Sequence, residues 1–392
     1  MYKYGQEEIE AMAKVLESGW LFRYDGEASS LRQVEQFEAG FAERMQVPYA
    51  VAVSSGTGAL ICSLVGLGIG PGDEVIVPGY TFIATAAAVV NVGAVPVIAE
   101  VDETLTMDVE DVRRKITPHT KAIIPVHMTG VVCNLDPIFK IAREHGLFVI
   151  EDACQAIGGA YKGQPLGSLG DAGAFSLNFY KIIGVGEGGA AITHDPVVFD
   201  RMRLYHDCGV SFWGRKSGQA SEIIPGINYR MSEVLGAFAL VQLGRLDSFL
   251  AGMQPVKKGI YRAVGDVLKP APQNDADGDC GTTLHFQFDA VENAVRFERL
   301  LSERGVGASR PINTGRHVYS NWEFVMNKAN VCPNWDVWGA PHYTGSVEYA
   351  PDMCPNTLDI LARTVAIATS PFWTDKDVGD LVKHLLGAAK EL

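Results

Sequence analysis

The chain has 392 residues, of which 47% are apolar and 20% are charged, and its formal net charge is −13. A chain of this length can bury a large core and is long enough for two or three domain-sized units. The acidic balance argues against a protein that holds nucleic acid through clustered lysines and arginines. The high apolar content argues against a disordered chain.

The seven cysteines are scattered along the chain, and no two of them have the C-x-x-C spacing. Their odd number and wide spacing argue against a disulfide framework or a thiolate zinc site. We therefore expect no metal and a reducing, cytoplasmic environment. The N-terminal sequence MYKYGQEEIEAM has acidic residues where a secretory signal needs an apolar segment.

The first predicted elements alternate between helix and strand. Periodic apolar residues predict, in chain order, a helix at Val34–Met45, a strand at Tyr49–Val53 and a helix of small residues at Thr57–Leu67. The sequence GIGPGDE then marks a turn, because its glycines and proline interrupt both kinds of period.

An uncharged stretch follows this turn. The 25 residues between Glu74 and Glu100 contain no Asp, Glu, Lys or Arg, a length that would suffice for a membrane span. Prolines and glycines divide the stretch at short intervals, however. We predict two buried strands, Val75–Val77 and Val95–Ala99, that flank a helix near Phe82–Asn91, because a parallel sheet covered on both faces has such uncharged strands. No membrane association is expected.

The alternation continues to residue 150. The further predicted elements are helices at Val109–Lys115 and Leu135–Glu144 and strands at Lys121–Val126 and Leu147–Ile150. Strands that alternate with helices of this length indicate right-handed βαβ units and a mostly parallel sheet, so the fold class is α/β.

The pattern changes after residue 150. Short apolar pieces rich in glycine, from Ala160 to about Asp195, predict a hairpin and sheet edges, and Met231–Leu246 predicts a helix. Loop-forming residues after this helix suggest a domain boundary. We therefore expect a large domain over residues 1–249 and a smaller α/β domain over residues 250–392, with a strand at His285–Asp289 and a helix at Ala290–Arg304.

Two motifs lie where a strand meets the next element. The sequence SSGTGAL follows the strand Tyr49–Val53 and opens a helix, so its backbone N–H groups could hold an anion. A plain N-cap turn is the alternative. The second motif is Asp152, a carboxylate at the end of the predicted strand Leu147–Ile150. This is the edge where open α/β sheets bind ligands, although Asp152 could also cap a helix.

Two further motifs lie beyond residue 170. Lys181 stands among aromatic residues and glycines in AFSLNFYK, a setting in which desolvation makes an amine nucleophilic. The alternative is a surface lysine whose alkyl stem packs on the protein. The sequence GINYRMSE precedes the predicted helix at Met231, where Asn228 or Ser232 could act as a helix cap.

Together these motifs resemble the DegT/DnrJ/EryC1/StrS family of aminotransferases that use pyridoxal 5'-phosphate (PLP). The match runs through most of residues 18–250, in the order and at the spacing of that family. It is carried by the sequences SSGTGAL, PGYTFIATA, VHMTG, EDACQAIGGAYKG, GSLGDAGAFSLNFYK, GEGGA and GINYRMSE. The resemblance implies the aspartate-aminotransferase fold (fold type I) and a homodimer in which both chains contribute to each active site.

The resemblance also implies roles for single residues. Lys181 matches the lysine that forms the internal aldimine with PLP, and Asp152 matches the carboxylate on the pyridine nitrogen, which keeps the ring an electron sink. Gln155 matches a residue beside the ring, and Phe82 matches the aromatic side chain that stacks on it. The remaining cofactor residues are a phosphate cradle, Gly56, Thr57 and Ser176, and Asn228, which should reach the neighbouring chain's cofactor.

The lysine at position 181 separates two activities within the family. Relatives that dehydrate sugars carry histidine there, whereas a lysine can move the proton that transamination requires. We therefore expect amino transfer from glutamate or glutamine to a keto or aldehyde group of a sugar or cyclitol. The alternative is a non-transaminating PLP enzyme, such as a sugar dehydratase or a dehydratase similar to aminohydroxybenzoate synthase.

The sequence says least about the substrate that accepts the amino group. The segment GWLFRYDG places Arg23 and Tyr24 where the family has a loop that lines its active site. Similar arginine-bearing loops occur in relatives that act on carboxylated substrates. Among these, the motifs of this sequence resemble most those of the 8-amino-3,8-dideoxy-octulosonate transaminases. We expect Arg23 to hold a carboxylate in a bidentate fork, with a surface arginine as the alternative. His317 is a candidate substrate residue.

Overall fold

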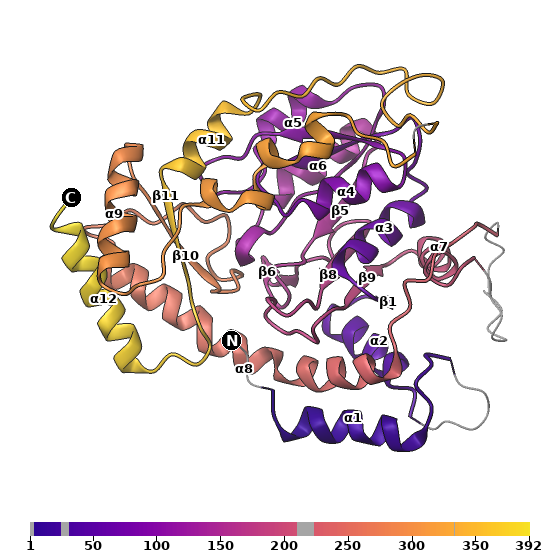
Figure 1. Cartoon of the computed structure of the whole chain (residues 1–392), viewed down its shortest axis with the longest axis horizontal. Helices are drawn as coiled ribbons and strands as arrows, with labels where there is room; N and C mark the ends of the chain where they lie inside the picture. Colours follow the sequence, from indigo (N-terminus) through magenta and orange to yellow (C-terminus); the bar gives the residue numbers. More distant parts are fainter. Residues whose placement is uncertain (1–3, 25–30, 210–222, 333) are drawn as a thin grey trace.

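The computed structural model describes residues 4–24, 31–209, 223–332 and 334–392. Its centre is a seven-stranded sheet in which, among these residues, β9 alone runs opposite to the other six strands. Helices cover both faces of the sheet (Figure 1), as predicted. Across the sheet the strands are β1 (Tyr49–Val53), β9 (Gly189–Thr193), β8 (Ala172–Ser176), β5 (Phe148–Asp152), β4 (Thr120–Ile123), β2 (Glu74–Pro78) and β3 (Val95–Ala99).

The uncharged stretch after residue 74 lies inside this sheet. Every residue of β2 and β3 is buried. The two strands pair directly in parallel, and the helix α4 (Ala84–Asn91) connects them. The two strands and the helix predicted here are confirmed, and their lack of charge follows from burial on both faces of the sheet.

All the helices predicted for the large domain are present, and α1 and α7 are additional helices that were not predicted. In chain order the helices are α1 (Gln6–Ser18), α2 (Gln33–Arg44), α3 (Gly56–Gly66), α5 (Val109–Lys115), α6 (Leu135–His145), α7 (Pro196–His206) and α8 (Glu233–Val264). Ser55, Asp108, Asp195 and Ser232 cap α3, α5, α7 and α8 by accepting backbone N–H groups, which supports these helix starts.

One part of the sheet prediction is wrong. The glycine-rich segment after residue 160 does contain a small hairpin, β6 (Ala160–Tyr161) with β7 (Gln164–Pro165). The next two strands, β8 and β9, lie in the interior of the large sheet rather than at its edge. Their small residues suit this place, since an added Cβ at Gly173 would lie 2.1 Å from the carbonyl oxygen of Gly167.

The small domain has its own core. The strands β10 (Thr283–Gln287) and β11 (Thr364–Ala368) pair antiparallel, and α9 (Val291–Glu303) and α12 (Asp375–Ala389) pack beside them (Figure 1). The predicted strand and helix are therefore confirmed. The predicted boundary at residue 249 falls inside α8, however, which continues into the small domain as one helix of 32 residues.

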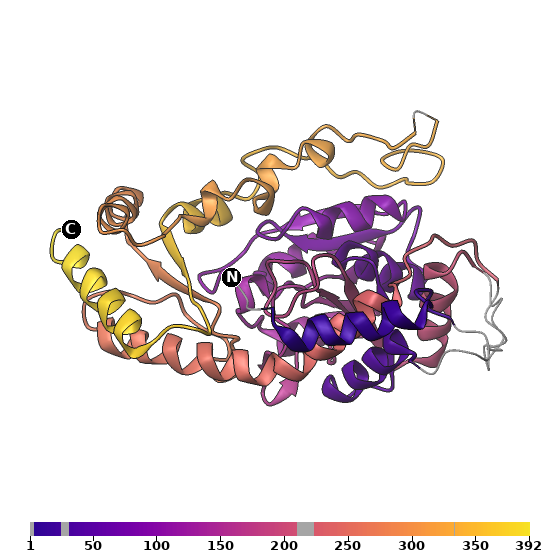
Figure 2. The same ribbon diagram turned by 60° about the horizontal axis from the view of Figure 1, so that its bottom comes forward.

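The segment between α9 and β11 belongs largely to the large domain. After α9 the chain runs back across the large domain, as Figure 2 shows, through α10 (Glu323–Met326) and α11 (Pro355–Ala362). Tyr319 and Trp322 are fully buried in the same core as β2 and α4. Residues beyond α9 therefore contribute to the core around β2 and α4.

Helix α8 is long and apolar enough to cross a membrane by length and composition alone, as no other helix of the described residues is. The helices α1 and α2 pack along it, and Ala239, Leu246 and Phe249 join the core of the large domain. This packing is typical of the central helix of a folded domain. All seven cysteines lie in described parts of the chain and are free thiols.

Candidate active site

A cavity of about 680 Å³ lies at the edge of the sheet where β5 and β8 end. Because β1, β5 and β8 point the same way, their carboxyl ends meet here, where open α/β sheets bind ligands. Both domains contribute to its wall. The predicted site residues that line the cavity are Gly56, Thr57, Phe82, Asp152, Gln155, Ser176, Lys181 and His317.

The N-terminus of α3 forms one end of the cavity. The Ser55 hydroxyl accepts the N–H of Gly58 at 3.0 Å, so the N–H groups of Gly56 and Thr57 remain at the start of the helix, where an anion is favoured. A Cβ on Gly56 would lie only 2.7 Å from the Cβ of Ser176. Only glycine fits there, and it keeps the backbone next to the Ser176 hydroxyl.

Asp152 lies in the middle of the cavity wall, at the carboxyl end of β5. Its side chain is only 4% exposed. One carboxylate oxygen, Oδ2, accepts the Thr85 hydroxyl at 2.8 Å, and the other, Oδ1, accepts the backbone N–H of Cys154 at 3.1 Å. The carboxylate is therefore buried and held by donors on both oxygens, as a fixed negative group requires.

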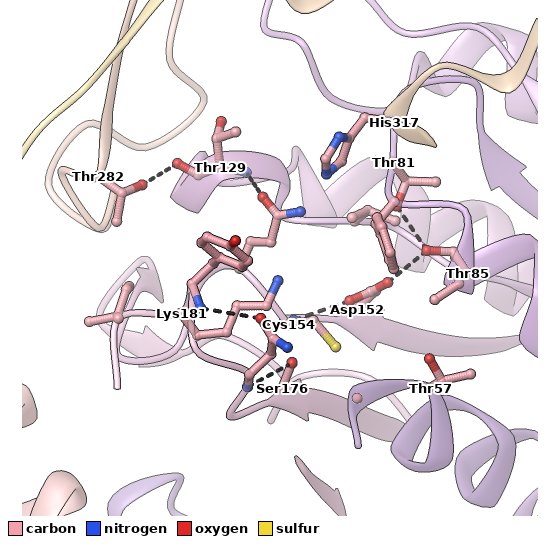
Figure 3. A pocket seen from close by; sticks show the side chains of 18 of the residues that line it. Thr57, Thr81, Thr85, Thr129, Asp152, Cys154, Ser176, Lys181, Thr282 and His317 are labelled. Atoms are coloured by element: carbon pink, nitrogen blue, oxygen red, sulfur yellow. Dashed lines mark hydrogen bonds between the residues drawn. The ribbon is translucent and has the colours of Figure 1, made fainter. Parts of the chain in front are cut away.

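Lys181 follows β8 on a short loop, and its side chain reaches into the cavity toward Asp152 (Figure 3). The loop is shaped by Asn178, whose side-chain oxygen accepts the N–H of Tyr180 at 3.2 Å and whose amide donates to Glu187 at 2.9 Å. Within the described residues no hydrogen bond holds Nζ of Lys181, so the amine is available to a ligand.

Phe82 and His317 form the wall that faces Lys181. Their rings lie 5.4 Å apart between centroids, and Phe82 is 38% exposed toward the cavity. Burial lowers the pKa of His317 from its usual value, and the Lys181 ammonium lowers it further. His317 is therefore neutral at pH 7, and with Nδ1 3.3 Å from the carbonyl of Thr314 its Nε2 is left to accept a proton.

Gln155 is oriented by Thr129, which in turn contacts His285 of the small domain. Its side-chain oxygen accepts the N–H of Thr129 at 3.1 Å, so its amide group is free to turn toward the cavity. The Thr129 hydroxyl donates to Met128 and therefore accepts from Nε2 of His285 on β10. Burial and Lys257 lower the pKa of His285 to about 3, so this histidine is neutral.

Asn228 does not line the cavity of its own chain. It is exposed, and its backbone pairs with Asp207 on the surface of the large domain. An exposed position is compatible with the predicted role, in which Asn228 reaches the cofactor of a neighbouring chain, and this role stays a prediction.

Arg23 and Tyr24 also lie away from the cavity. The Arg23 side chain is 6% exposed and paired with Glu38. Arg23 donates to the carbonyl of Ala52 at 2.8 Å, and Glu38 accepts the N–H of the same residue at 2.7 Å. The pair thus occupies the free edge of β1 as a neighbouring strand would.

This geometry gives Arg23 a structural role in its own chain, and a role toward a substrate carboxylate stays a prediction. A guanidinium that already holds Glu38 and Ala52 inside the protein is not placed to grip a substrate carboxylate in this cavity. Tyr24 lies beside it, with its hydroxyl 3.4 Å from Nε2 of His206. The sequence could not separate the two readings, because the partner Glu38 lies on another element, α2.

Replacing Arg23 by alanine is expected to lower stability rather than substrate affinity. The change leaves the Glu38 carboxylate buried without its partner, which costs about 3 kcal/mol or more. Thermal unfolding and the KM for each substrate check this. Arg299→Ala, which removes an exposed pair with Glu303, is the control and should cost less than about 1 kcal/mol. A raised KM with unchanged stability would contradict the structural role.

Some cavity residues were not assigned a role from the sequence. The hydroxyl residues Thr81, Thr85, Thr129 and Thr282 lie around the predicted residues. Thr81 and Thr85 stand inside the quoted sequence PGYTFIATA. Their four-residue spacing was the available signal, because the structure places Thr85 in α4 and Thr81 three residues before it, with the two hydroxyls 2.8 Å apart.

Comparisons with known proteins show which family the chain belongs to. The sequence matches the DegT/DnrJ/EryC1/StrS aminotransferase family over residues 3–386. It is similar to the spore coat polysaccharide biosynthesis protein SpsC of Bacillus subtilis, with 34% identity over 98% of this chain and 95% of that protein. It is also similar to the GDP-perosamine synthase of Caulobacter vibrioides, with 44% identity over 61% of this chain and 65% of that protein.

Solved structures show the same fold. An aminotransferase from Psychrobacter cryohalolentis superimposes with a TM-score of 0.83 at 28% identity, covering 99% of this chain and 98% of that one. A 3-amino-5-hydroxybenzoic acid synthase gives 0.80 at 28% identity, covering 100% and 98%. The family match spans nearly the whole chain, and the fold type I architecture agrees with it. The chain therefore belongs to the DegT/DnrJ/EryC1/StrS aminotransferase family and is a PLP-dependent aminotransferase.

Proposed function

We propose that this enzyme moves an amino group from glutamate or glutamine to the keto or aldehyde carbon of a nucleotide-linked sugar, with PLP as cofactor. The observation that carries the proposal is the meeting of three groups in one cavity. These groups are the amine of Lys181, the buried carboxylate of Asp152, and the helix start at Gly56 and Thr57.

The cavity fits PLP by its chemistry. The start of α3 and the hydroxyls of Thr57 and Ser176 suit a phosphate group. The Asp152 carboxylate, fixed by donors on both oxygens, suits a protonated ring nitrogen. When bound, PLP supplies an aldehyde that takes up the amino group and a ring that accepts electrons.

The chain's own residues divide the work of the reaction. Lys181 reaches the centre of the cavity, where its Nζ can anchor the cofactor and carry a proton to or from the reacting carbon. Asp152, held by Thr85 and Cys154, would hold the proton on the ring nitrogen of a bound cofactor. Phe82 lines one wall of the cavity, where it would cover one face of a bound ring.

The lysine at position 181 supports amino transfer over dehydration. Relatives that dehydrate sugars resemble this chain but carry histidine there. The similarity to 3-amino-5-hydroxybenzoic acid synthase keeps a dehydratase as the second candidate. In a dehydratase of that kind, an amino donor would not convert the cofactor to its amine form.

The acceptor is proposed from two observations. The GDP-perosamine synthase, by its name, makes a nucleotide-linked amino sugar. The Arg23 side chain, which was the reason to expect a carboxylated acceptor such as an octulosonate, is occupied by Glu38. A nucleotide-linked keto sugar is therefore the first substrate to test, and an 8-oxo octulosonate is the second.

We also propose that the enzyme is a homodimer, because Asn228 is exposed and lies outside the cavity of its own chain. We propose a cytoplasmic location, because the free thiols suit a reducing compartment. In a dimer Asn228 would reach the phosphate of the partner's cofactor. Light scattering on the active enzyme tests this state, and a monomeric mass would contradict it.

The experiment for the function has two stages. Glutamate or glutamine is added to the purified PLP-loaded enzyme, and we expect the visible band of the bound cofactor to disappear as the amine form accumulates. The amine form is then offered a panel of nucleotide-linked keto sugars and the octulosonate, and the returning band identifies the acceptor. A visible band that neither donor changes would contradict amino transfer from these donors.

A further inference from the structure

We propose that Thr85 is a positioning residue of this reaction. Through a directed chain of two hydroxyl groups that begins at Thr81, it holds the Asp152 carboxylate toward the ring nitrogen of the cofactor. The proposal rests on the proposed function, since it concerns the same cofactor.

The chain consists of two short hydrogen bonds in a buried place. The Thr85 hydroxyl donates to Oδ2 of Asp152 at 2.8 Å, and the hydroxyls of Thr81 and Thr85 lie 2.8 Å apart (Figure 3). Thr81 is fully buried and Thr85 is 1% exposed. In such a place a hydrogen bond is stronger than in water, and a missing partner is costly.

The direction of the chain follows from counting protons. A threonine hydroxyl has one proton, and that of Thr85 goes to the carboxylate, which can only accept when it is charged. Thr85 must therefore accept the proton of Thr81 across the second bond. Both hydroxyl protons therefore point along the chain toward Asp152.

Two donors on different oxygens also fix how the carboxylate is turned. Thr85 binds Oδ2, and the N–H of Cys154 binds Oδ1. Rotation of the carboxylate about its χ2 angle would break both bonds. The ring nitrogen of a bound cofactor would therefore meet a group that is already oriented, which is how preorganised sites lower a barrier.

The segment that carries the hydroxyls is itself tied to the cavity wall. The N–H of Thr81 donates to the carbonyl of His317 at 3.0 Å, and the N–H of Ile83 donates to that of Arg316 at 2.9 Å. Phe82 lies between these two residues and faces the cavity. One short segment thus positions the ring-facing aromatic side chain, the His317 segment and the carboxylate.

The test compares Thr85→Val with Thr85→Ser in the full-length enzyme. Valine keeps the shape but removes the donor, whereas serine keeps the hydroxyl. For Thr85→Val we expect kcat to fall by about 10- to 100-fold, the range for a hydrogen bond to a charged group. The dissociation constant of PLP, measured by equilibrium dialysis, should rise, and the KM of the donor should change little. Thr85→Ser should restore most of both losses.

The other outcomes separate the two proposals. A wild-type enzyme that binds no PLP, or whose bound PLP does not respond to either donor, would overturn the proposed function and this inference with it. A wild-type enzyme that responds, beside a Thr85→Val variant within twofold of it in kcat and in PLP affinity, would overturn this inference alone. Equal losses in the serine and valine variants would also overturn it, because packing rather than the hydroxyl would then matter.

Discussion

Replacing Lys181 by alanine is expected to abolish amino transfer while leaving the fold intact. The side chain reaches into the cavity, and within the described residues no hydrogen bond ties its amine to the protein, so little structural stability depends on it. Loss of the group that moves the proton lowers kcat by about 100- to 10,000-fold, equivalent to about 3 to 5 kcal/mol in the barrier.

The attachment of the cofactor gives a second measurement on the same variant. Treatment of the wild-type enzyme with borohydride should leave PLP covalently bound to the peptide that contains Lys181, as mass spectrometry would show. The Lys181→Ala variant should release its PLP on denaturation. Lys140→Ala, at an exposed position on α6, is the matched control and should behave as the wild type. Covalent PLP in the Lys181→Ala variant would contradict the assignment.

Replacing Asp152 by asparagine is expected to have the second largest effect. Asparagine has nearly the same shape, but it removes the negative charge that faces the ring nitrogen and brings a donor to a place where Thr85 and Cys154 already donate. Loss of one preorganised electrostatic contact lowers kcat by about 100- to 1,000-fold. The half-reaction with glutamate, followed by the visible band, measures the loss directly.

A control separates charge at the site from charge in general. Asp136→Asn removes a carboxylate that is 60% exposed and paired with Lys162 on the surface, so its kcat should stay within twofold of the wild type. If Asp152→Asn retained more than half of the wild-type kcat, the carboxylate would not be needed on the ring nitrogen.

Much of the fold was predictable because its first half follows local rules. The uncharged strands β2 and β3 and the capped helix α3 each show their type within a few residues of sequence. The place of β8 and β9 inside the sheet could not be read in this way. It depends on pairing with strands that lie far away in the chain, and short glycine-rich strands have no period that distinguishes an interior position from an edge.

In the candidate site, too, some residues can be predicted from local sequence and others cannot. Lys181 and Asp152 stand in motifs that are local in sequence, and the structure brings both into one cavity. The roles of Arg23 and Thr85 depend on partners far away in the chain, Glu38 and Ala52 for the first and Asp152 for the second. The sequence shows that these residues are present, but only the folded structure shows which residues they contact.

The return of the chain across the large domain has a consequence for synthesis on the ribosome. The core around β2 and α4 also contains Tyr319, Trp322 and Leu361. Domains commonly fold in the order in which they are made, but this core lacks part of its packing until residue 361 has left the ribosome. The two domains are therefore expected to complete their folding at nearly the same time. A nascent chain stalled at residue 300 should still bind chaperones through the apolar residues of this core that remain exposed.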